Sequence, residues 1–414
     1  MNNYISVEVF IENDISGDWG KEFPDEKHKI KAFCVRGADI NDLNIGKTEN
    51  LPVRYVKEAS KDKFLEKGNI IIEISGGSPT QSTGRVAFLE NIDREVVCSN
   101  FCRALKIKKE YSSKYVFYLL QNIYNSGVFF NFESKTSGIK NLLYNSAFEN
   151  IKVPNRDYSS QQKIENVITV IDKKIQLLYQ INDNLAKLAK TIYDYWFVQF
   201  DFPDENGKPY KYSGGKMVYN EVLKREIPQG WEVDNIFNVA SIQYGFPFST
   251  EFFNENKIGV PVIRIRDIKD NQISNFSTEE KIDSKYIIKK GEILIGMDGN
   301  FHINYWANDN CYLNQRVVKI QGIELSNIYL KEQIEPYIKT REKSISRTTV
   351  GHLSDKDLRS INIIIPNNLI MIKINSFYNN TLNKFIENLQ QIQHLQSLRD
   401  WLLPMLMNGQ VSVE

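Results

Sequence analysis

The stretch SSQQKIENVITVIDKKIQLLYQINDNLAKLAKTIYDYWF, residues 159–197, determines the fold that we predict for this chain. Aliphatic residues recur every seven positions, at Ile164, Ile171, Leu178, Leu185 and Ile192, and a companion set falls at Ile168, Ile175, Asn182, Ala189 and Trp196. This alternating spacing of three and four predicts a helix that packs along its length against another helix. At ~1.5 Å per residue, roughly 38 residues make a rod about 55 Å long. Ser159 and Ser160 are expected to cap its start.

Asn182 interrupts this otherwise apolar seam. A single buried Asn in such a seam fixes register and partner at some cost in stability. The alternative is an ordinary bundle helix that tolerates one polar residue, and the residues leave both interpretations open. The length of the helix favours a spacer or a dimerisation element.

The composition indicates a multidomain protein without a strong electrostatic preference. A chain of 414 residues is too long for one core, so two or three domains are expected. It has no run of about 18 apolar residues and no signal peptide pattern at its start, which predicts a cytoplasmic protein. Lys and Arg number 52 against 51 Asp and Glu, so any nucleic-acid surface must come from local segregation of charge. The four cysteines are expected to be buried thiols rather than zinc ligands.

The second half of the chain repeats the first. Arg36 and Asp39 correspond to Arg264 and Asp267, and Lys67-Gly68 corresponds to Lys290-Gly291. A strand is predicted over 68–74 and a helix over 114–125. Shifting the helical seam by 207 residues places it on a second apolar seam that includes Leu382, Phe385, Leu389 and Ile392. The repeat therefore predicts two globules and two long helices in alternation.

The predicted fold class is α+β, with two mixed α/β domains separated by two long antiparallel coiled-coil helices and an internal pseudo-two-fold repeat. The helices are expected to pair because one globule cannot cover an apolar stripe of that length. The predicted boundaries are 1–155 for the first domain, 156–198 for the central helix, 199–230 for a turn-rich connector, 231–366 for the second domain and 367–414 for the distal helix and tail.

Catalytic motifs are not found, but paired polar loops are. The sequence has no phosphate-binding loop, no dinucleotide fingerprint, no zinc protease motif and no adenine methyltransferase motif. Both halves instead carry small or polar residues after a strand and again before each long helix. Backbone amides and hydroxyls bind phosphates, whereas Arg, Asn and Asp can read base edges. The candidate DNA-binding residues are Arg36, Gly76, Gly77, Ser78, Arg85, Lys135, Thr136, Ser137, Arg264, Arg266, Asp298, Asn300, Arg347, Thr348, Thr349 and His352.

A structural role remains the alternative for several of these residues. For Asp39 and Asp267 we favour ion pairs with arginine inside each globule over DNA contacts. His352 is also compatible with an ordinary surface position. No residue is predicted to bind a metal.

The connector and the C-terminal tail resemble those of the specificity subunits of type I restriction–modification systems. The similar segments are FDFPDENGKPYK (200–211), SGGKM (213–217), LKREIPQGW (223–231) and LRDWLLPMLMNGQV (398–411). The resemblance extends over essentially the whole chain, including the repeat. One departure is the first globule, which lacks the Ile-Pro-x-Gly-Trp opening of 227–231, so its start is expected to fold differently.

The resemblance implies two target-recognition domains that each read one half of a split, asymmetric DNA site. It also implies docking of two methylation subunits and of restriction or translocase subunits. The chain itself is then non-catalytic and binds no cofactor, while S-adenosylmethionine, ATP and Mg²⁺ belong to the partners. A spacer of roughly 50 Å exceeds one DNA turn of about 34 Å, in keeping with two separated contacts.

Two other classes of protein remain as alternatives. A coiled-coil scaffold that binds proteins predicts no salt-dependent DNA affinity. A self-sufficient methyltransferase or nuclease is disfavoured by the missing motifs. The leading prediction is a DNA-specificity subunit whose helices act as an intramolecular spacer, so that adding or removing a turn changes the gap between the half-sites.

Overall fold

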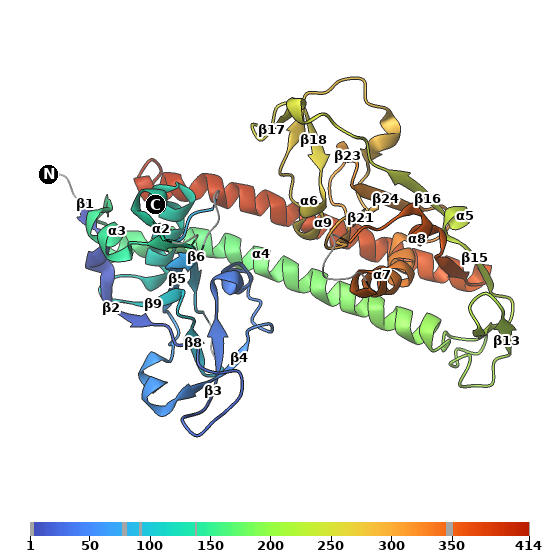
Figure 1. Ribbon diagram of the computed structural model, residues 1–414, viewed down its shortest axis with the longest axis horizontal. Coiled ribbons are helices and arrows are strands. Elements are labelled where there is room, and N and C mark those ends of the chain that lie inside the picture. The colour runs from blue at the N-terminus through green and yellow to red at the C-terminus, as the bar shows by residue number, and fades with distance from the viewer. Residues whose placement is uncertain (1–3, 77–80, 91–92, 137–138, 345–350, 414) are drawn as a thin grey trace. The chain divides into compact units, whose positions relative to one another are not determined.

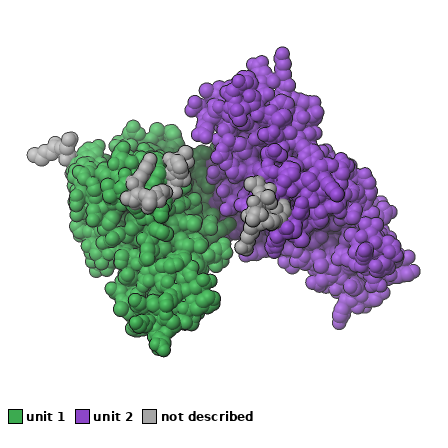
Figure 2. Space-filling view, in the orientation of Figure 1, with its two compact units in different colours: residues 1–177, 394–414 green, residues 178–393 purple. Residues whose placement is uncertain are grey.

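The computed structural model describes residues 4–76, 81–90, 93–136, 139–344 and 351–413. The chain divides into two compact units (Figure 2): residues 1–177 and 394–414 form unit 1, and residues 178–393 form unit 2. Each unit combines a mixed α/β globule with part of each of two long helices, α4 (Tyr158–Tyr193) and α9 (Asn368–Asn408) (Figure 1). The architecture confirms the predicted α+β class with an internal repeat.

The centre of unit 1 is a four-stranded sheet whose strands alternate their side chains between two layers. Ile70 and Ile72 of β5 join a core with the helix α2 (Ser113–Asn125), whereas Ile71 joins a second core with Val35 of the neighbouring sheet. This alternation follows from the two-residue period of a strand. The strands of the first sheet, in spatial order, are β2 (Ile11–Ser16), β9 (Cys102–Ile107), β5 (Ile70–Glu73) and β7 (Val86–Phe88). Those of the second are β4 (Val53–Lys57), β3 (His28–Val35) and β8 (Val96–Cys98).

Unit 2 repeats this plan with different side chains. Ile293 and Ile295 of β21 face one core, and Leu294 faces another that includes Trp306. The equivalent sheet runs β16 (Ala240–Tyr244), β24 (Val317–Gly322), β21 (Ile293–Gly296) and β22 (Ile303–Tyr305). The second sheet runs β17 (Phe253–Asn254), β19 (Phe276–Ser277), β18 (Val260–Ile263), β23 (Cys311–Leu313) and β20 (Ile287–Ile288). In both units the second sheet contains a parallel pair, β3·β8 and β18·β23.

Each globule packs one longer helix of its own against its sheet. The Oγ of Ser112 accepts a hydrogen bond from the backbone N–H of Tyr115 at the start of α2. The Oγ of Ser326 accepts one from Ile328 at the start of α7 (Asn327–Ser344). The prediction of a helix over 114–125 is confirmed. The sequence predicts no helix over 327–344, because α7 contains Pro336 and lacks a clear amphipathic pattern.

The start of each globule pairs with a strand that precedes the long helix. In unit 1, β1 (Tyr4–Ser6) pairs antiparallel with β12 (Lys152–Pro154), and in unit 2, β15 (Glu232–Asn235) pairs in the same way with β25 (Asn362–Ile365). The expectation of a different start for the first globule was therefore wrong for this strand. Short helices accompany these strands and sheets: α1 (Ile40–Asn44), α3 (Tyr144–Asn150), α5 (Ile236–Val239), α6 (Ile265–Asp270) and α8 (Asp355–Arg359).

The connector after α4 belongs to the core of unit 2. The helix ends in a π-helical turn (Asp194–Val198), and a hairpin of β13 (Met217–Asn220) and β14 (Arg225–Pro228) follows. The ring of Phe202 stacks on that of Trp231, with centroids 5.0 Å apart. The turn-rich segment is thus fastened by aromatic packing.

Both long helices begin with a capping side chain. The carboxylate of Asp157 accepts a hydrogen bond from the backbone N–H of Ser160 (2.9 Å), and hydrogen bonding lowers the pKa of Asp157. The amide oxygen of Asn367 accepts one from Ile370 (3.1 Å) at the start of α9. Asp157, rather than Ser159 or Ser160, therefore caps α4.

The two long helices run antiparallel within each unit. In unit 2, Asn388 donates a hydrogen bond to the amide oxygen of Asn182 (2.8 Å), and Tyr378 donates to the carbonyl of Ala189 (3.1 Å). In unit 1, Arg399 donates to the carboxylate of Asp172 (3.1 Å). As residue numbers increase along α4, the numbers of their partners on α9 decrease.

The predicted seam residues are buried or half-buried, but not all serve helix pairing. Ile164 and Ile168 belong to the core of the unit 1 globule, and Leu382 belongs to the main core of unit 2. Asn182 is buried and contacts Asn388, one position from the Leu389 that the repeat places in register with it. The other predicted seam residues are buried (Ile175, Leu178, Ile392) or half-buried (Ile171, Leu185, Phe385, Leu389).

Candidate DNA-recognition site

Three chain segments meet at one end of the four-stranded sheet of unit 2. The backbone N–H of Met297, just after β21, donates to the carbonyl of Arg316 (2.9 Å), and Leu353 donates to the carbonyl of Met297 (2.8 Å). Asp298 and His352 form an isolated antiparallel bridge beside these bonds. The strand end, the residue before β24 and the segment before α8 are therefore held together by the backbone.

Unit 1 contains the same backbone arrangement. Ile74, just after β5, donates to the carbonyl of Phe101 (2.8 Å), and Leu142 donates to the carbonyl of Ile74 (2.8 Å). Here the segments are short strands, β6 (Ser75–Gly76), β10 (Glu133–Thr136) and β11 (Ile139–Leu142). The matching hydrogen bonds make three pairs of positions equivalent: Ser75 with Asp298, Phe101 with Arg316, and Asn141 with His352.

The three side chains of unit 2 form a charged cluster, which we call the Arg316 cluster: Arg316, Asp298 and His352. The Nε of Arg316 forms an ion pair with one carboxylate oxygen of Asp298 (3.2 Å), and the Nδ1 of His352 lies 2.6 Å from the other. The side chains of Arg316 and His352 are 56% and 47% exposed, against 29% for Asp298. One half-buried carboxylate thus orients two exposed nitrogen-bearing groups.

The equivalent side chains of unit 1 form a neutral cluster, which we call the Phe101 cluster: Phe101, Ser75 and Asn141. The hydroxyl of Ser75 donates to the amide oxygen of Asn141 (2.6 Å). Phe101 is 55% exposed, which is unusual for a large apolar side chain. The two units therefore present different chemistry on one backbone frame.

The structure brings together Asp298 and His352, both of which the sequence singled out, and adds Arg316, which it did not. Cys102 donates to the carbonyl of Ser99 and Val317 donates to that of Asn314, both at 2.9 Å. Ser99 therefore corresponds to Asn314, and Phe101 corresponds to Arg316.

The Arg–Asp positions of the repeat are local turn anchors. Arg36 donates to both carboxylate oxygens of Asp39 (2.9 and 2.8 Å), and these hydrogen bonds raise the pKa of Arg36. The carboxylate of Asp267 accepts the backbone N–H of Arg264 (2.8 Å), while the guanidinium of Arg264 donates to Ser274 (3.0 Å). Burial, with a contribution from Arg266, lowers the pKa of Arg264. The favoured ion pair is confirmed for Arg36 and Asp39, and Asp267 caps a turn instead.

Arg85 lies in a buried ion pair. Its guanidinium donates twice to the carboxylate of Glu73, at 2.6 and 2.8 Å, and this pairing raises the pKa of Arg85. Only 3% of the Glu73 side chain is exposed. This pairing gives Arg85 a structural role within unit 1.

The structure describes some of the remaining candidate residues. Arg266 and Asn300 are exposed, and Gly76 is half-buried with a φ of 135°, a backbone conformation that favours glycine. Lys135 and Thr136 are placed by the backbone of β10. Gly77, Ser78, Ser137, Arg347, Thr348 and Thr349 lie outside the described residues.

Neither a metal cluster nor a membrane span is found in the part of the chain that the structure describes. It contains no group of three or more His, Cys, Asp or Glu side chains that could hold a metal ion. Although α4 and α9 are long, no helix there has an apolar stretch sufficient to cross a membrane. All four cysteines are buried, as expected.

Two repeated α/β units with paired long helices and exposed loop clusters define a two-domain recognition protein. The family model described as "Type I restriction modification DNA specificity domain" matches residues 32–187 and 228–394. The chain therefore belongs to this family of type I restriction–modification specificity proteins.

Individual relatives and a solved structure agree with this assignment. The type I restriction enzyme MjaIX specificity subunit of Methanocaldococcus jannaschii is 27% identical, over 88% of this chain and 82% of the relative. The HindI specificity subunit of Haemophilus influenzae is 24% identical, over 96% and 98%. The crystal structure of the type I restriction–modification S subunit from M. genitalium covers 98% of this chain and 95% of its own, with a TM-score of 0.54 at 16% identity. The last likeness supports the fold.

Proposed function

We propose that this chain is the sequence-specific DNA-binding subunit of a type I restriction–modification complex, and that each unit reads one half of a two-part, asymmetric site. The observation that carries the proposal is the pair of equivalent clusters. One backbone frame can approach DNA in the same way twice, whereas Phe101 in one unit and Arg316 in the other require different bases. Such a protein recognises two unlike half-sites.

The other proposed DNA contacts are polar residues that the sequence indicates in each domain. We keep residues 77–78 and 135–137 in the first target-recognition domain (1–155), and Arg266, Asn300 and 347–349 in the second (231–366). Hydroxyls and backbone amides there suit phosphate oxygens, whereas arginine and asparagine suit base edges. The near-zero net charge of the chain makes local clusters of this kind necessary for binding.

The proposed partners are two methylation subunits, joined by restriction or translocase subunits. Unit 1 exposes apolar residues at a spacing of seven on α4, Val170 and Leu177, and unit 2 exposes Leu188 of α4 and Tyr195 of the π-helical turn that follows it. Residues seven apart lie on one face of an α-helix, so Val170 and Leu177 form a short apolar strip suited to a protein partner. In this proposal the chain is non-catalytic, and the partners use S-adenosylmethionine, ATP and Mg²⁺.

Methylation profiling of a host with and without this gene tests the proposal. The expected result is a two-part motif with an unread gap, methylated only when the gene is present. Footprinting of the complex with its methylation subunits should show two protected patches. One continuous patch would contradict two-part reading, and the absence of salt-dependent DNA affinity would favour a protein-binding scaffold.

The paired helices are proposed to set the gap between the half-sites. Inserting seven residues into α4 near Asn184 and seven into the paired part of α9 keeps the apolar seam in phase. We expect a longer gap with unchanged bases in both half-sites, measured by the same methylation profile. An unchanged gap in a folded, active complex would rule out the spacer role.

A further inference from the structure

We propose that Arg316, held by Asp298, reads a guanine in the half-site bound by unit 2, which deepens the proposed function and rests on it. The ion pair with Asp298 is made through Nε (3.2 Å), and the Arg316 side chain is 56% exposed, so the donors of its terminal amino groups can serve a ligand. A guanine presents two acceptors, O6 and N7, in the major groove, and arginine is their commonest specific partner. The geometry of this pair fits guanine better than it fits the other three bases.

Asp298 acts as a positioning residue in this arrangement. A free arginine side chain loses rotamer entropy when it is fixed. The carboxylate holds the side chain before DNA arrives, which reduces that loss. It also holds His352, so both exposed groups share one anchor.

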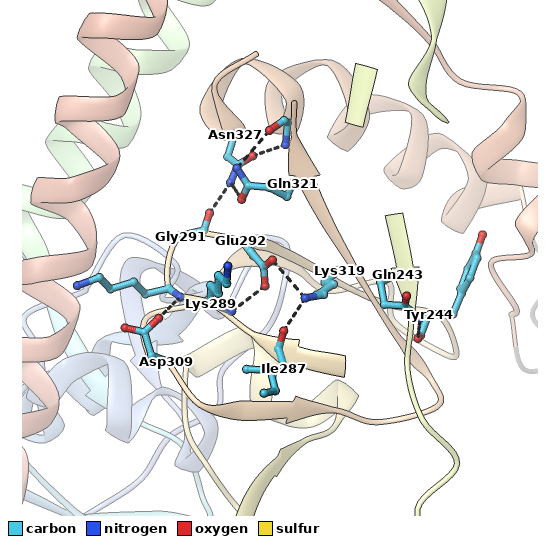
Figure 3. A network of polar contacts seen from close by, with 12 residues as sticks. Gln243, Tyr244, Ile287, Lys289, Gly291, Glu292, Asp309, Lys319, Gln321 and Asn327 are labelled. Atoms are coloured by element: carbon cyan, nitrogen blue, oxygen red, sulfur yellow. Dashed lines mark hydrogen bonds and ion pairs between the residues drawn. The ribbon is translucent and has the colours of Figure 1, made fainter. Parts of the chain in front are cut away.

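The cluster stands at the ends of two packed strands of unit 2. Arg316 directly precedes β24 and Asp298 follows β21, and a polar network joins β24 and the residues just before β21 to the start of α7 (Figure 3). Lys319 reaches the carboxylate of Glu292 (3.3 Å), and Asn327 donates to the carbonyl of Gly291 (2.7 Å). Sites built on supported strands hold their geometry more precisely than sites on unsupported loops.

The equivalent cluster of unit 1 predicts a different base. Phe101 has no donor, and its exposed ring suits apolar contact with the methyl group of a thymine. The guanine requirement should therefore appear in one half-site only. A guanine requirement in only one half-site would distinguish base reading by Arg316 from a role that both clusters share.

The test uses the complex of this chain with its methylation subunits and duplexes carrying the motif found by methylation profiling. Each base pair of each half-site is replaced in turn, and binding is measured by competition. For Arg316→Ala we expect the preference for guanine at one position to fall roughly 5- to 150-fold, with the other positions unchanged. Arg316→Lys should retain part of the preference, and Asp298→Asn should weaken it less than Arg316→Ala does.

Arg359→Ala is the matched control. Arg359 is also an arginine of unit 2, is 60% exposed and is bonded through its Nε to Asp355 (2.5 Å). It lies at the end of α8, outside the Arg316 cluster. This variant should leave every base preference unchanged.

Three outcomes would overturn the proposal. Equal weakening on all duplexes, with a shallower salt dependence, would make Arg316 a phosphate contact. If the variant has a lower melting temperature but an unchanged base preference, the cluster only stabilises the fold. If binding is unchanged, Arg316 does not contact the DNA. If the wild-type complex itself yields no two-part motif, the proposed function fails before Arg316 is tested.

Discussion

The two units build the same sheet but bury their ion pairs in different places. In unit 1, Glu73 at the end of β5 pairs with Arg85 at 2.6 Å. In unit 2, the pair joins Glu292, just before β21, to Lys319 of β24 at 3.3 Å. The fully buried apolar runs Ile70–Ile72 and Ile293–Ile295 are alike. Apolar alternation thus sets the shared topology, while the polar positions inside it differ between the copies.

The same contrast holds at the surface. Phe101 in unit 1 and Arg316 in unit 2 occupy positions that make equivalent backbone hydrogen bonds. A strand end fixed by its neighbours tolerates many side chains that point into solvent, because they contribute little to stability. The repeat can therefore keep its fold while each copy acquires its own recognition chemistry.

The buried ion pairs should give the largest effects and should act within their own units. Glu73→Gln leaves the half-buried Arg85 without its charged partner, and Lys319→Met does the same to the buried Glu292. Each is expected to cost about 3–5 kcal/mol of unfolding free energy. Hydrogen exchange should show lost protection of β5 in the first variant and of β21 in the second.

A double replacement separates loss of charge pairing from loss of packing. Glu73→Leu with Arg85→Met removes both charges while it keeps side-chain volume, and it should recover most of the stability. If the double variant is as unstable as Glu73→Gln, pairing is not the cause. Loss of protection spread equally over both units would contradict their independence.

The helix pair should show the next largest effect. In unit 2 it contains the buried Asn182–Asn388 bond, whereas in unit 1 it contains the bond from Arg399 to the carboxylate of Asp172, which also accepts from Tyr118 of α2. Asn182→Ala leaves Asn388 without this partner in the interior, at a cost of about 1–3 kcal/mol. Denaturant unfolding measures this cost.

Replacing both asparagines by leucine tests why they are retained. Asn182→Leu with Asn388→Leu should restore or raise stability, because buried polar pairs set register more than they stabilise. We expect a less uniform register, seen as heterogeneous disulfide trapping between introduced cysteine pairs along α4 and α9. A single register in this variant would show that the asparagines do not specify it.

Exchanging cluster chemistry between the units should give the smallest effect. Ser75→Asp with Phe101→Arg copies the Asp298–Arg316 pair into unit 1. We expect a new preference for guanine in the half-site of that unit, of about fivefold, equivalent to ~1 kcal/mol. The competition assay with substituted duplexes measures it. Phe101→Arg alone should gain less because no carboxylate holds the side chain, and equal gains would show that the anchor is unimportant.

Some features of the site were visible in the sequence and others were not. The Arg36 and Arg264 turns were aligned correctly, because a three-residue spacing from Arg to Asp is a local pattern. Arg316 was missed because its role depends on Asp298 and His352, which lie 18 and 36 positions away in the sequence. The ion pair of Arg85 was not foreseen because the sequence cannot show that Glu73 faces it inside the sheet.

The sequence alone determined the alternation of globules and long helices, since heptad spacing and strand alternation are local periodicities that survive in any tertiary context. Only the tertiary structure decided which seam residues pack against the other long helix and which pack against a globule. Ile164, Ile168 and Leu382 carry the heptad signal, yet each packs into a globule. No sequence pattern around Asn388 in the second long helix singles it out. Its role is evident only from its hydrogen bond with Asn182, 206 residues earlier. Burial and pairing are properties of two chain segments together, and neither segment alone encodes them.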